Sequence, residues 1–295
     1  MKKLSVLRGI ACMLMAGFFL ASNDAVTKWL VPLYPVGEIL FFQAIVISFL
    51  VAGLMRFRGE ALLAFNHWGL HLCRGLLYVV GSFSFVFALK FLPLAEVVAI
   101  AFAGPLFMTL LARFMLKEVV GWHRIAAVVT GFVGVIIIIR PGGSAMHWAV
   151  LLPLIVALSD AFRDVITRKM TAAESSTRIV LSTAVILALA AGSTSVGGWP
   201  SVAQSDYVWF LLSGICFVAG HFFLIEAFRN APVTVVAPFK YAQLIWSILA
   251  GLIFWNELPD GIVFVGIAVI ACSGVYIAWR EAKLSRAQRR LVEEL

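Results

Sequence analysis

The sequence contains few charged residues: Asp, Glu, Lys and Arg make up 13% of its 295 residues, against about 25% in soluble domains. Its four cysteines all lie inside apolar runs, and their spacing matches neither a metal site nor a disulfide framework. Gly-rich phosphate loops, nucleophile elbows and metal-binding His patterns are also missing from it. These absences argue against an enzyme and predict neither a metal nor a bound cofactor.

Apolar residues dominate instead, at 62% of the chain with a mean hydropathy of +1.02. A bilayer core about 30 Å thick is crossed by roughly 20 apolar residues in a helix. The apolar runs are too long for the alternating strands of a membrane β-barrel. The sequence therefore predicts an all-α integral membrane protein with ten transmembrane helices. Their expected ranges are 8–30, 36–55, 71–91, 94–116, 122–139, 147–168, 178–197, 206–229, 233–254 and 260–279.

Basic residues are distributed unevenly between alternate loops. Of the 23 Lys and Arg residues, nineteen fall on one predicted side, and the other side receives Lys28, Lys90 and Arg140. By the positive-inside rule this places both termini in the cytoplasm of a bacterial cell, with the chain crossing the inner membrane many times. The net charge of +8 is then explained by the basic residues that fix the orientation of the chain in the membrane. Its expected partner is anionic membrane lipid, and nucleic acid is not expected.

The second half of the chain repeats the first. The first-half residues Gly75, Gly81, Phe83, Ala88, Pro93, Val97 and Glu118 recur 139 positions later as Gly214, Gly220, Phe222, Ala227, Pro232, Val236 and Glu257. At an offset of 140, the pattern of Asp24, Thr27 and Lys28 recurs with Asp164, Thr167 and Arg168. The repeat predicts one unit over 1–141, a second over 147–281, and a basic tail over 282–295. The repeat also argues against a cleaved signal peptide at the N-terminus, because the first helix has a counterpart.

Five helices per unit is an odd number, so the second unit must cross the membrane in the opposite sense. Inverted repeats with a site at their interface are typical of transporters that work by alternating access. The chain has no ATP-binding segment. The organisation therefore predicts a secondary carrier of a small organic solute.

Several short motifs resemble the drug/metabolite transporter superfamily, in its EamA branch of ten-helix carriers. The first-half motifs are Ser22-Asn23-Asp24, Ala88 with Pro93, Pro105 and Glu118. The second-half motifs are Glu226-Ala227-Phe228, Pro232-Val233, Ala237-Pro238-Phe239 with Tyr241, Ile245-Trp246, and Glu257 with Pro259. Lys240 departs from the pattern between Phe239 and Tyr241. The resemblance implies a fold of two inverted five-helix repeats.

The details are most similar to bacterial members described as riboflavin or S-adenosylmethionine carriers. The resemblance implies riboflavin uptake as the preferred function. The alternatives are S-adenosylmethionine uptake, or export of an amino-acid-like or anionic metabolite. A membrane scaffold or enzyme is a further alternative, and the oligomeric state is left open.

Lys240 is the most costly residue to place in a bilayer, and a charge at such a depth marks a functional site by default. Gln243 lies on the same helix face, and Tyr241 and Trp246 flank it. This arrangement predicts contact with an anionic or planar, ring-bearing solute. The alternative is that Lys240 extends to the lipid headgroups.

Asn23 and Asp24 are expected to face these residues from the first helix. Asp24 and its repeat partner Asp164 are each followed four residues later by a cation, the favourable order for an ion pair within a helix. They are predicted either as gates at opposite ends of the pathway or as interfacial ion pairs.

Three further residues are candidates for gating or proton coupling. Asp160 shares a face with Asp164 but lies deeper, and His221 can titrate near neutral pH. Glu226 precedes Arg229 by three residues, which also suits a salt bridge. Protons are therefore a possible coupling ion in this prediction.

Overall fold

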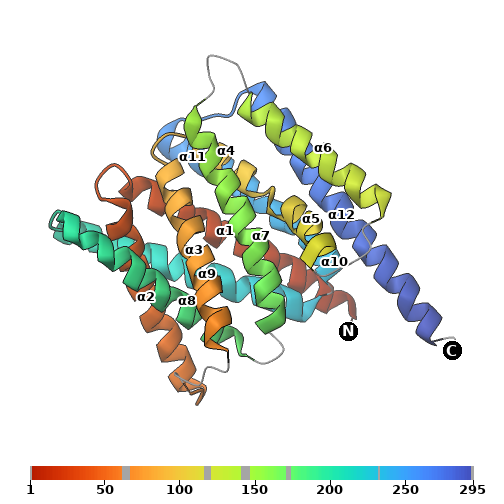
Figure 1. The fold of residues 1–295 in the computed structure, drawn as a ribbon, viewed down its shortest axis with the longest axis horizontal. Coiled ribbons are helices and arrows are strands. Elements are labelled where there is room, and N and C mark those ends of the chain that lie inside the picture. The colour runs from red at the N-terminus through yellow and green to blue at the C-terminus, as the bar shows by residue number, and fades with distance from the viewer. Residues whose placement is uncertain are drawn as a thin grey trace.

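Regular secondary structure in the described part of the chain is entirely helical (Figure 1). The computed structural model describes residues 2–61, 67–115, 121–140, 147–170, 174–231 and 233–293. The α-helices are α1 (Lys2–Leu30), α2 (Val36–Phe57), α3 (Trp68–Ala88), α4 (Leu94–Ala101), α5 (Gly104–Met115), α6 (Trp122–Ile139), α7 (Leu151–Met170), α8 (Ser176–Gly192), α9 (Tyr207–Asn230), α10 (Val233–Val236), α11 (Ala242–Trp255) and α12 (Gly261–Glu293). Short 3₁₀ segments are η1 (Trp148–Val150), η2 (Ser193–Gly197), η3 (Gln204–Asp206) and η4 (Ala237–Tyr241).

Seven helical segments of the described chain are long and apolar enough to cross a membrane: Val6–Leu30, Val36–Phe57, Trp68–Ala88, Leu94–Leu111, Ser176–Gly197, Gln204–Ala227 and Gly261–Arg280. Ile125–Ile139 and Phe239–Trp255 are shorter apolar helices. The one predicted crossing not yet accounted for is the sixth, over 147–168. It corresponds to α7, which carries Asp160, Arg163 and Asp164. Its low hydropathy follows from these charges, which line a cavity rather than face lipid. The ten-helix prediction is confirmed at this level.

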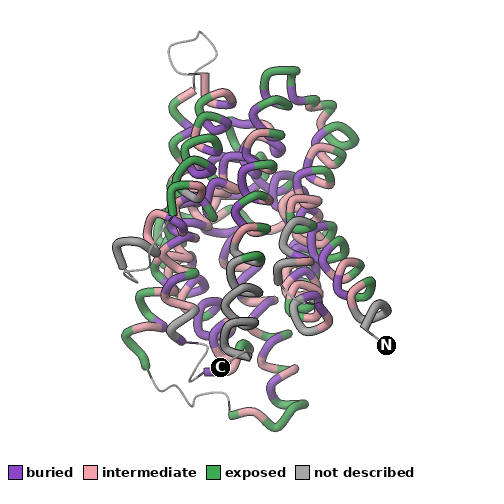
Figure 2. The backbone as a smooth tube through the Cα atoms, turned by 90° about the vertical axis from the view of Figure 1, so that its right-hand side faces the viewer, coloured by how far each residue is buried: buried purple, intermediate pink, exposed green. Residues whose placement is uncertain are grey.

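The outer faces of the bundle are strongly apolar. Exposed residues lie along the outward sides of the helices and buried ones along the inward sides (Figure 2). Phe49 and Leu189, for example, are 75% and 71% exposed. Large apolar side chains exposed along the length of a bundle match the hydrocarbon of a bilayer, whereas a soluble monomer rarely exposes extended apolar patches.

The fourth and ninth predicted helices are both interrupted near a proline. The fourth breaks between α4 and α5, at Phe102 and Ala103, just before Pro105. The ninth is divided into α10, the 3₁₀ segment η4 that contains Pro238, and α11. Proline has no N–H to donate to a helical hydrogen bond, which explains why these helices break here. Broken membrane helices are tolerated where the freed backbone lines a cavity or is buried in protein.

Two predicted boundaries differ from those observed. The third helix begins at Trp68, three residues before the predicted start at residue 71. At the other end of the chain, α12 continues to Glu293, so residues 282–293 of the predicted tail extend the last helix.

The packing follows a two-fold exchange of the two halves. The main partner of α1 is α9, and α3 packs in the same way against α7, the equivalent pair after exchange. The pairs α2–α8 and α6–α12 are each their own equivalents and form opposite edges of the bundle (Figure 1). The two halves are therefore interlocked along their whole length, which agrees with a duplicated chain. The boundaries at 141 and 147 stay a prediction, and residues 141–146 lie outside the described chain.

Two repeated glycines explain how close this packing is. Gly214 of α9 lies against Val46 of α2, and its repeat partner Gly75 of α3 lies against Ile186 of α8. Val46 and Ile186 are themselves 140 positions apart. A Cβ atom at Gly214 would lie 2.7 Å from Cβ of Val46, and one at Gly75 would lie 3.0 Å from Cβ of Ile186. The same pair of contacts thus occurs once in each half.

We expect Gly214→Ala to destabilise the protein by about 1–3 kcal/mol, the usual cost of overpacking a close contact. The added methyl group meets the branch point of Val46, which cannot swing aside. Gly53→Ala is the matched control, because nothing lies within 4 Å of its Cβ position, and alanine favours a helix by about 1 kcal/mol over glycine. Thermal unfolding in detergent measures both. An unchanged melting temperature in Gly214→Ala would contradict the close packing of α9 on α2.

Candidate functional site

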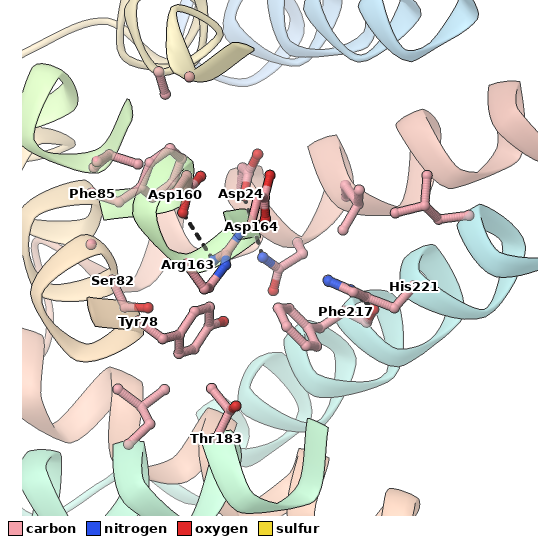
Figure 3. Close-up of a pocket in the computed structure, with 18 of the residues that line it drawn as sticks. Asp24, Tyr78, Ser82, Phe85, Asp160, Arg163, Asp164, Thr183, Phe217 and His221 are labelled. Carbon is pink, nitrogen blue, oxygen red and sulfur yellow. Dashed lines mark hydrogen bonds and ion pairs between the residues drawn. The ribbon is translucent and has the colours of Figure 1, made fainter. Parts of the chain in front are cut away.

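A cavity of about 640 Å³ lies between the two halves. Its walls come from α1, α2, α3 and the α4–α5 break in the first half, and from α7, α8, α9, η4 and α11 in the second. This volume falls within the range of roughly 300–1,000 Å³ that is typical of small-molecule sites. Figure 3 shows that charged side chains of α7 point into it toward aromatic side chains of α3 and α9.

The cavity is closed at one end of the bundle. We call this the Lys28 end, where α1 finishes and α4 begins, and the opposite end, where α3 begins and α7 finishes, the Thr167 end. At the Lys28 end the lining residue Thr27 is 2% exposed. Toward the Thr167 end, the side chain of the lining residue Asp164 is 50% exposed. The lining is therefore less deeply buried toward the Thr167 end than at the Lys28 end.

Asn23, Gln43 and Ser213 form a buried neutral cluster, called here the amide cluster. Nε2 of Gln43 donates to Oδ1 of Asn23 at 2.6 Å and to Oγ of Ser213 at 3.0 Å. Oγ of Ser213 also donates to Oδ1 of Asn23, at 2.9 Å. Because the Asn23 carbonyl accepts both hydrogen bonds, its amide nitrogen is directed elsewhere, toward Asp24.

Arg74, Thr167 and Thr183 form a second polar cluster between the halves, the Arg74 cluster, which shares two of its positions with the amide cluster through the repeat. Nε of Arg74 donates to Oγ1 of Thr167 at 2.8 Å, and its guanidinium also donates to Oγ1 of Thr183. Arg74 and Ser213 are 139 positions apart, and Gln43 and Thr183 are 140 apart. The duplicated positions therefore differ: a cation (Arg74) corresponds to a hydroxyl (Ser213), and an amide (Gln43) to a hydroxyl (Thr183).

Asp24 lies between two amide groups. Nδ2 of Asn23 donates to its Oδ1 at 3.3 Å, and Nε2 of Gln243 donates to its Oδ2 at 3.1 Å. Within the described chain no Lys, Arg or His forms an ion pair with it. Its carboxylate is thus held in the cavity by neutral donors, without a compensating cation.

On the opposite wall, Arg163 is paired with two carboxylates of its own helix. Its guanidinium lies 2.9 Å from Oδ1 of Asp160 and 3.7 Å from Oδ1 of Asp164. The same guanidinium lies over the Tyr78 ring, 5.5 Å from the centroid. Figure 3 shows the Arg163–Asp160 pair beside Tyr78, with Phe217 and His221 on the wall formed by α9.

The two helix breaks meet beside the cavity. Phe102, at the α4–α5 break, packs on Tyr241 of η4 with ring centroids 5.2 Å apart. These residues are themselves repeat partners, 139 positions apart. Nζ of Lys240 lies 5.9 Å from the Phe102 centroid, and Lys240 lines the cavity. The break thus brings a cation and an aromatic ring to the cavity wall.

Comparison with protein families gives the class of the protein. Residues 7–140 match the EamA-like transporter family. The first half of the chain is thus similar to EamA-like transporters. This agrees with the membrane-spanning helices and with the duplicated architecture, and it makes the protein a transporter rather than an enzyme.

Curated relatives are similar to the chain over most of its length. The chain is 28% identical to an S-adenosylmethionine uptake transporter of Rickettsia prowazekii, over 94% of each chain. It is 29% identical to a riboflavin transporter of Rhizobium johnstonii, over 94% of this chain and 93% of the other. One solved crystal structure has a TM-score of 0.62 at 20% identity, covering 94% of this chain and 98% of the other. That likeness shows the fold.

Most of the predicted site residues line this cavity. Among the predicted solute contacts, these are Asn23, Asp24, Lys240 and Gln243; among the predicted gating residues, they are Asp160, Asp164 and His221. His221 Nδ1 lies 3.0 Å from the Phe217 carbonyl oxygen. Their roles in binding or coupling stay predictions.

Three predicted site residues lie beside the cavity rather than in its lining. Tyr241 stands behind Phe102 with its hydroxyl next to Gly274, and Trp246 packs edge-on against Phe18 at 5.4 Å. Glu226 accepts a hydrogen bond from Nδ2 of Asn230 at 3.3 Å; the side chain of Arg229 lies outside the described residues. Their roles also stay predictions.

Sequence reasoning missed two residues of the site. Arg74 and Arg163 had been counted as topology signals at the cytoplasmic ends of their helices, yet both line the cavity. The repeat carried the signal: Arg74 aligns with Ser213 and Arg163 aligns with Asn23, and both partners are buried polar residues. Within the described residues, no group of three or more His, Cys, Asp or Glu could hold a metal ion.

The amide cluster yields a stability prediction. Gln43→Leu removes the donor to Asn23 and Ser213, and unsatisfied buried polar groups cost about 1–3 kcal/mol each. We therefore expect the melting temperature in detergent to fall by several degrees. The matched control is Ser48→Ala on the same helix, since Ser48 bonds only to the Ala44 carbonyl of its own helix. Equal melting temperatures for the two variants would show that the cluster contributes nothing to stability.

Proposed function

We propose that this protein carries a small organic metabolite through the central cavity by alternating access, without ATP. The observation that carries the proposal is a cavity between two interlocked, duplicated halves, whose lining is buried at the Lys28 end and partly exposed toward the Thr167 end. A two-fold related molecule can adopt the opposite arrangement by exchanging the roles of its halves. The transport cycle is then an exchange between these two arrangements.

The proposed orientation follows from the basic residues. The positive-inside rule places the Thr167 end and both termini in the cytoplasm, in a bacterial inner membrane. The structure then corresponds to the state that is open to the cytoplasm. The two repeat units over 1–141 and 147–281 are the proposed moving parts.

The charges of the cavity favour a solute that carries both signs. Asp24 has amide donors and no cation beside it in the described structure, so a cationic group of the solute would balance its charge. Arg74 is bonded to two threonine hydroxyls and the Ile179 carbonyl, and no described carboxylate forms an ion pair with it. A guanidinium in that setting suits a carboxylate.

A planar ring in the solute would suit the aromatic residues of the cavity lining. Tyr78, Phe85, Phe102 and Phe217 all line the cavity, and aromatic side chains provide apolar faces against which a planar ring can stack. S-adenosylmethionine combines a purine with a sulfonium, an ammonium and a carboxylate. It is therefore the solute we propose first, and one of the relatives is named for its uptake.

Riboflavin remains the second candidate and was the substrate preferred from the sequence. Its tricyclic ring suits the same aromatic wall, and another relative is named a riboflavin transporter. Riboflavin is uncharged at neutral pH, so it would leave both Asp24 and Arg74 unbalanced. Export of an amino-acid-like metabolite would use the same charge pattern in the reverse direction.

Proton coupling through Asp160, Asp164, His221 or Glu226 stays a prediction from the sequence. The contacts between Arg163 and the two aspartates are compatible with either a proton-linked role or a purely structural one. Solute recognition at Asp24 does not depend on which of these holds.

Asp24→Asn tests solute recognition. The substitution keeps the size of the side chain and removes its charge. A hydrogen bond to a charged group contributes about 1.5–3 kcal/mol, so we expect the affinity for S-adenosylmethionine to fall roughly 10–100-fold. Isothermal titration with the purified, detergent-solubilised protein measures this affinity, and riboflavin serves as the uncharged comparison.

The matched control is Asp260→Asn. Asp260 lies outside the cavity lining, in an exposed ion pair with Arg140, so its loss should leave solute affinity unchanged. Riboflavin binding that survives Asp24→Asn, with no binding of S-adenosylmethionine to the parent protein, would favour the second candidate. Failure of both compounds to bind would contradict both substrate proposals.

A further inference from the structure

One carboxylate joins three helices at the closed end of the cavity. Oε2 of Glu257, just after α11, forms an ion pair with Nζ of Lys28 near the end of α1. The same oxygen accepts a hydrogen bond of 3.3 Å from the backbone N–H of Leu94, the first residue of α4. The contact therefore ties two segments of the first half to one of the second.

The position of Lys28 connects this contact to the cavity. Lys28 directly follows Thr27, the last residue of α1 that lines the cavity, and it is 6% exposed. Its ammonium also lies 5.1 Å from the centroid of the Trp255 ring. A buried ammonium needs a partner close by, because removing it from water is costly. Lys28 therefore holds Glu257 and Trp255 over the closed end of the cavity.

The local spacing had suggested a different partner for Lys28. Asp24 lies four residues earlier on the same helix, yet it is bonded to Asn23 and Gln243 instead. Lys28 thus forms its ion pair with Glu257, which is 229 positions away in the sequence and lies across the boundary between the halves. An ion pair that merely stabilised α1 would not need to cross that boundary.

Opening the Lys28 end would separate these same segments. A solute leaving the cavity past Thr27 has to pass between α1, α4 and α11, which are the three elements held by Glu257. We propose that Glu257 is a positioning residue whose ion pair with Lys28 keeps this end closed and must break once in every transport cycle. The inference rests on the proposed alternating access.

We call the Lys28–Glu257 ion pair the latch. The accessibility of position 27 to a labelling reagent tests it directly. A Thr27→Cys reporter is made in a background in which the four native cysteines are replaced by alanine. Its labelling by a membrane-impermeant maleimide is measured in right-side-out and inside-out vesicles. We expect slow labelling from the Lys28 end in the reporter alone, and several-fold faster labelling from that end after Glu257→Gln. The glutamine keeps an oxygen that can accept from Leu94 and removes only the charge.

Asp260→Asn is the matched control for this reporter. Its ion pair with Arg140 is at the same end of α12 as Glu257, only three residues away, but it joins the peripheral helices α6 and α12. The Arg140 guanidinium lowers the pKa of Asp260, so this pair too is charged at neutral pH. Breaking it should leave the labelling of Thr27→Cys unchanged.

A second variant guards against loss of folding. Lys28→Gln breaks the same ion pair from the other side, and both variants are checked for a single peak in size-exclusion chromatography. Faster labelling in either folded variant, but not in Asp260→Asn, supports the latch. Labelling at the reporter's own rate in both folded variants would overturn it.

The labelling needs no solute, so this result separates the two proposals. A protein that transports solute while Glu257→Gln leaves the labelling unchanged keeps the proposed function and loses the latch. Faster labelling in a protein that transports none of the compounds tested keeps the latch as a conformational contact and removes the proposed substrates.

Discussion

Polar groups inside a bilayer have to find their partners within the protein, because lipid offers none. In the described part of this chain, that constraint gathers several buried polar groups at the interface of the two halves. Asn23 and Gln43 are satisfied there by Ser213 of the other half, and Arg74 is satisfied by Thr167 and Thr183. The lipid-facing surfaces can then remain apolar, and the interface becomes the place where a polar solute is accommodated.

Duplication gives the two halves equivalent helix contacts, and sequence divergence gives their cavity-lining positions different side chains. The two halves make equivalent helix contacts, including the pair of glycines that pack on Val46 and Ile186. At the cavity, however, equivalent positions have become different: Ser213 corresponds to Arg74. A symmetric scaffold thereby acquires an acidic wall at Asp24 and a basic wall at Arg74. This asymmetry is what allows one face of a solute to be distinguished from the other.

The repeat and the apolar runs were sufficient to predict the fold. Helix ends such as Pro35 and Pro93 were marked by residues that favour turns. The breaks near Pro105 and Pro238 interrupt helices that were predicted as continuous, and the missing N–H of proline explains them. Most predicted site residues proved to line one cavity, because an intramembrane polar residue has few other places to go. The start of α3 was less predictable, since His67 and Trp68 suit an interfacial segment as well as a helix.

Contacts between distant segments were beyond such reasoning. Spacing within one helix paired Lys28 with Asp24, whereas tertiary packing pairs it with Glu257. Trp246 follows Gln243 by three residues in α11 but packs against Phe18 of α1 instead of lining the cavity. Arg74 looked like a topology signal until α7 and α8 were placed beside it. Each of these outcomes depends on which helices meet, and a single sequence carries that information only through its repeat.

The most direct test of the account is counterflow in proteoliposomes that contain the purified chain and no ATP. Vesicles loaded with unlabelled S-adenosylmethionine are diluted into a trace of the labelled compound, with riboflavin tested in parallel. A cavity that opens alternately to the two sides predicts a transient accumulation of label above its equilibrium level. Simple equilibration of the label with both compounds, or no entry at all, would contradict alternating access to these solutes.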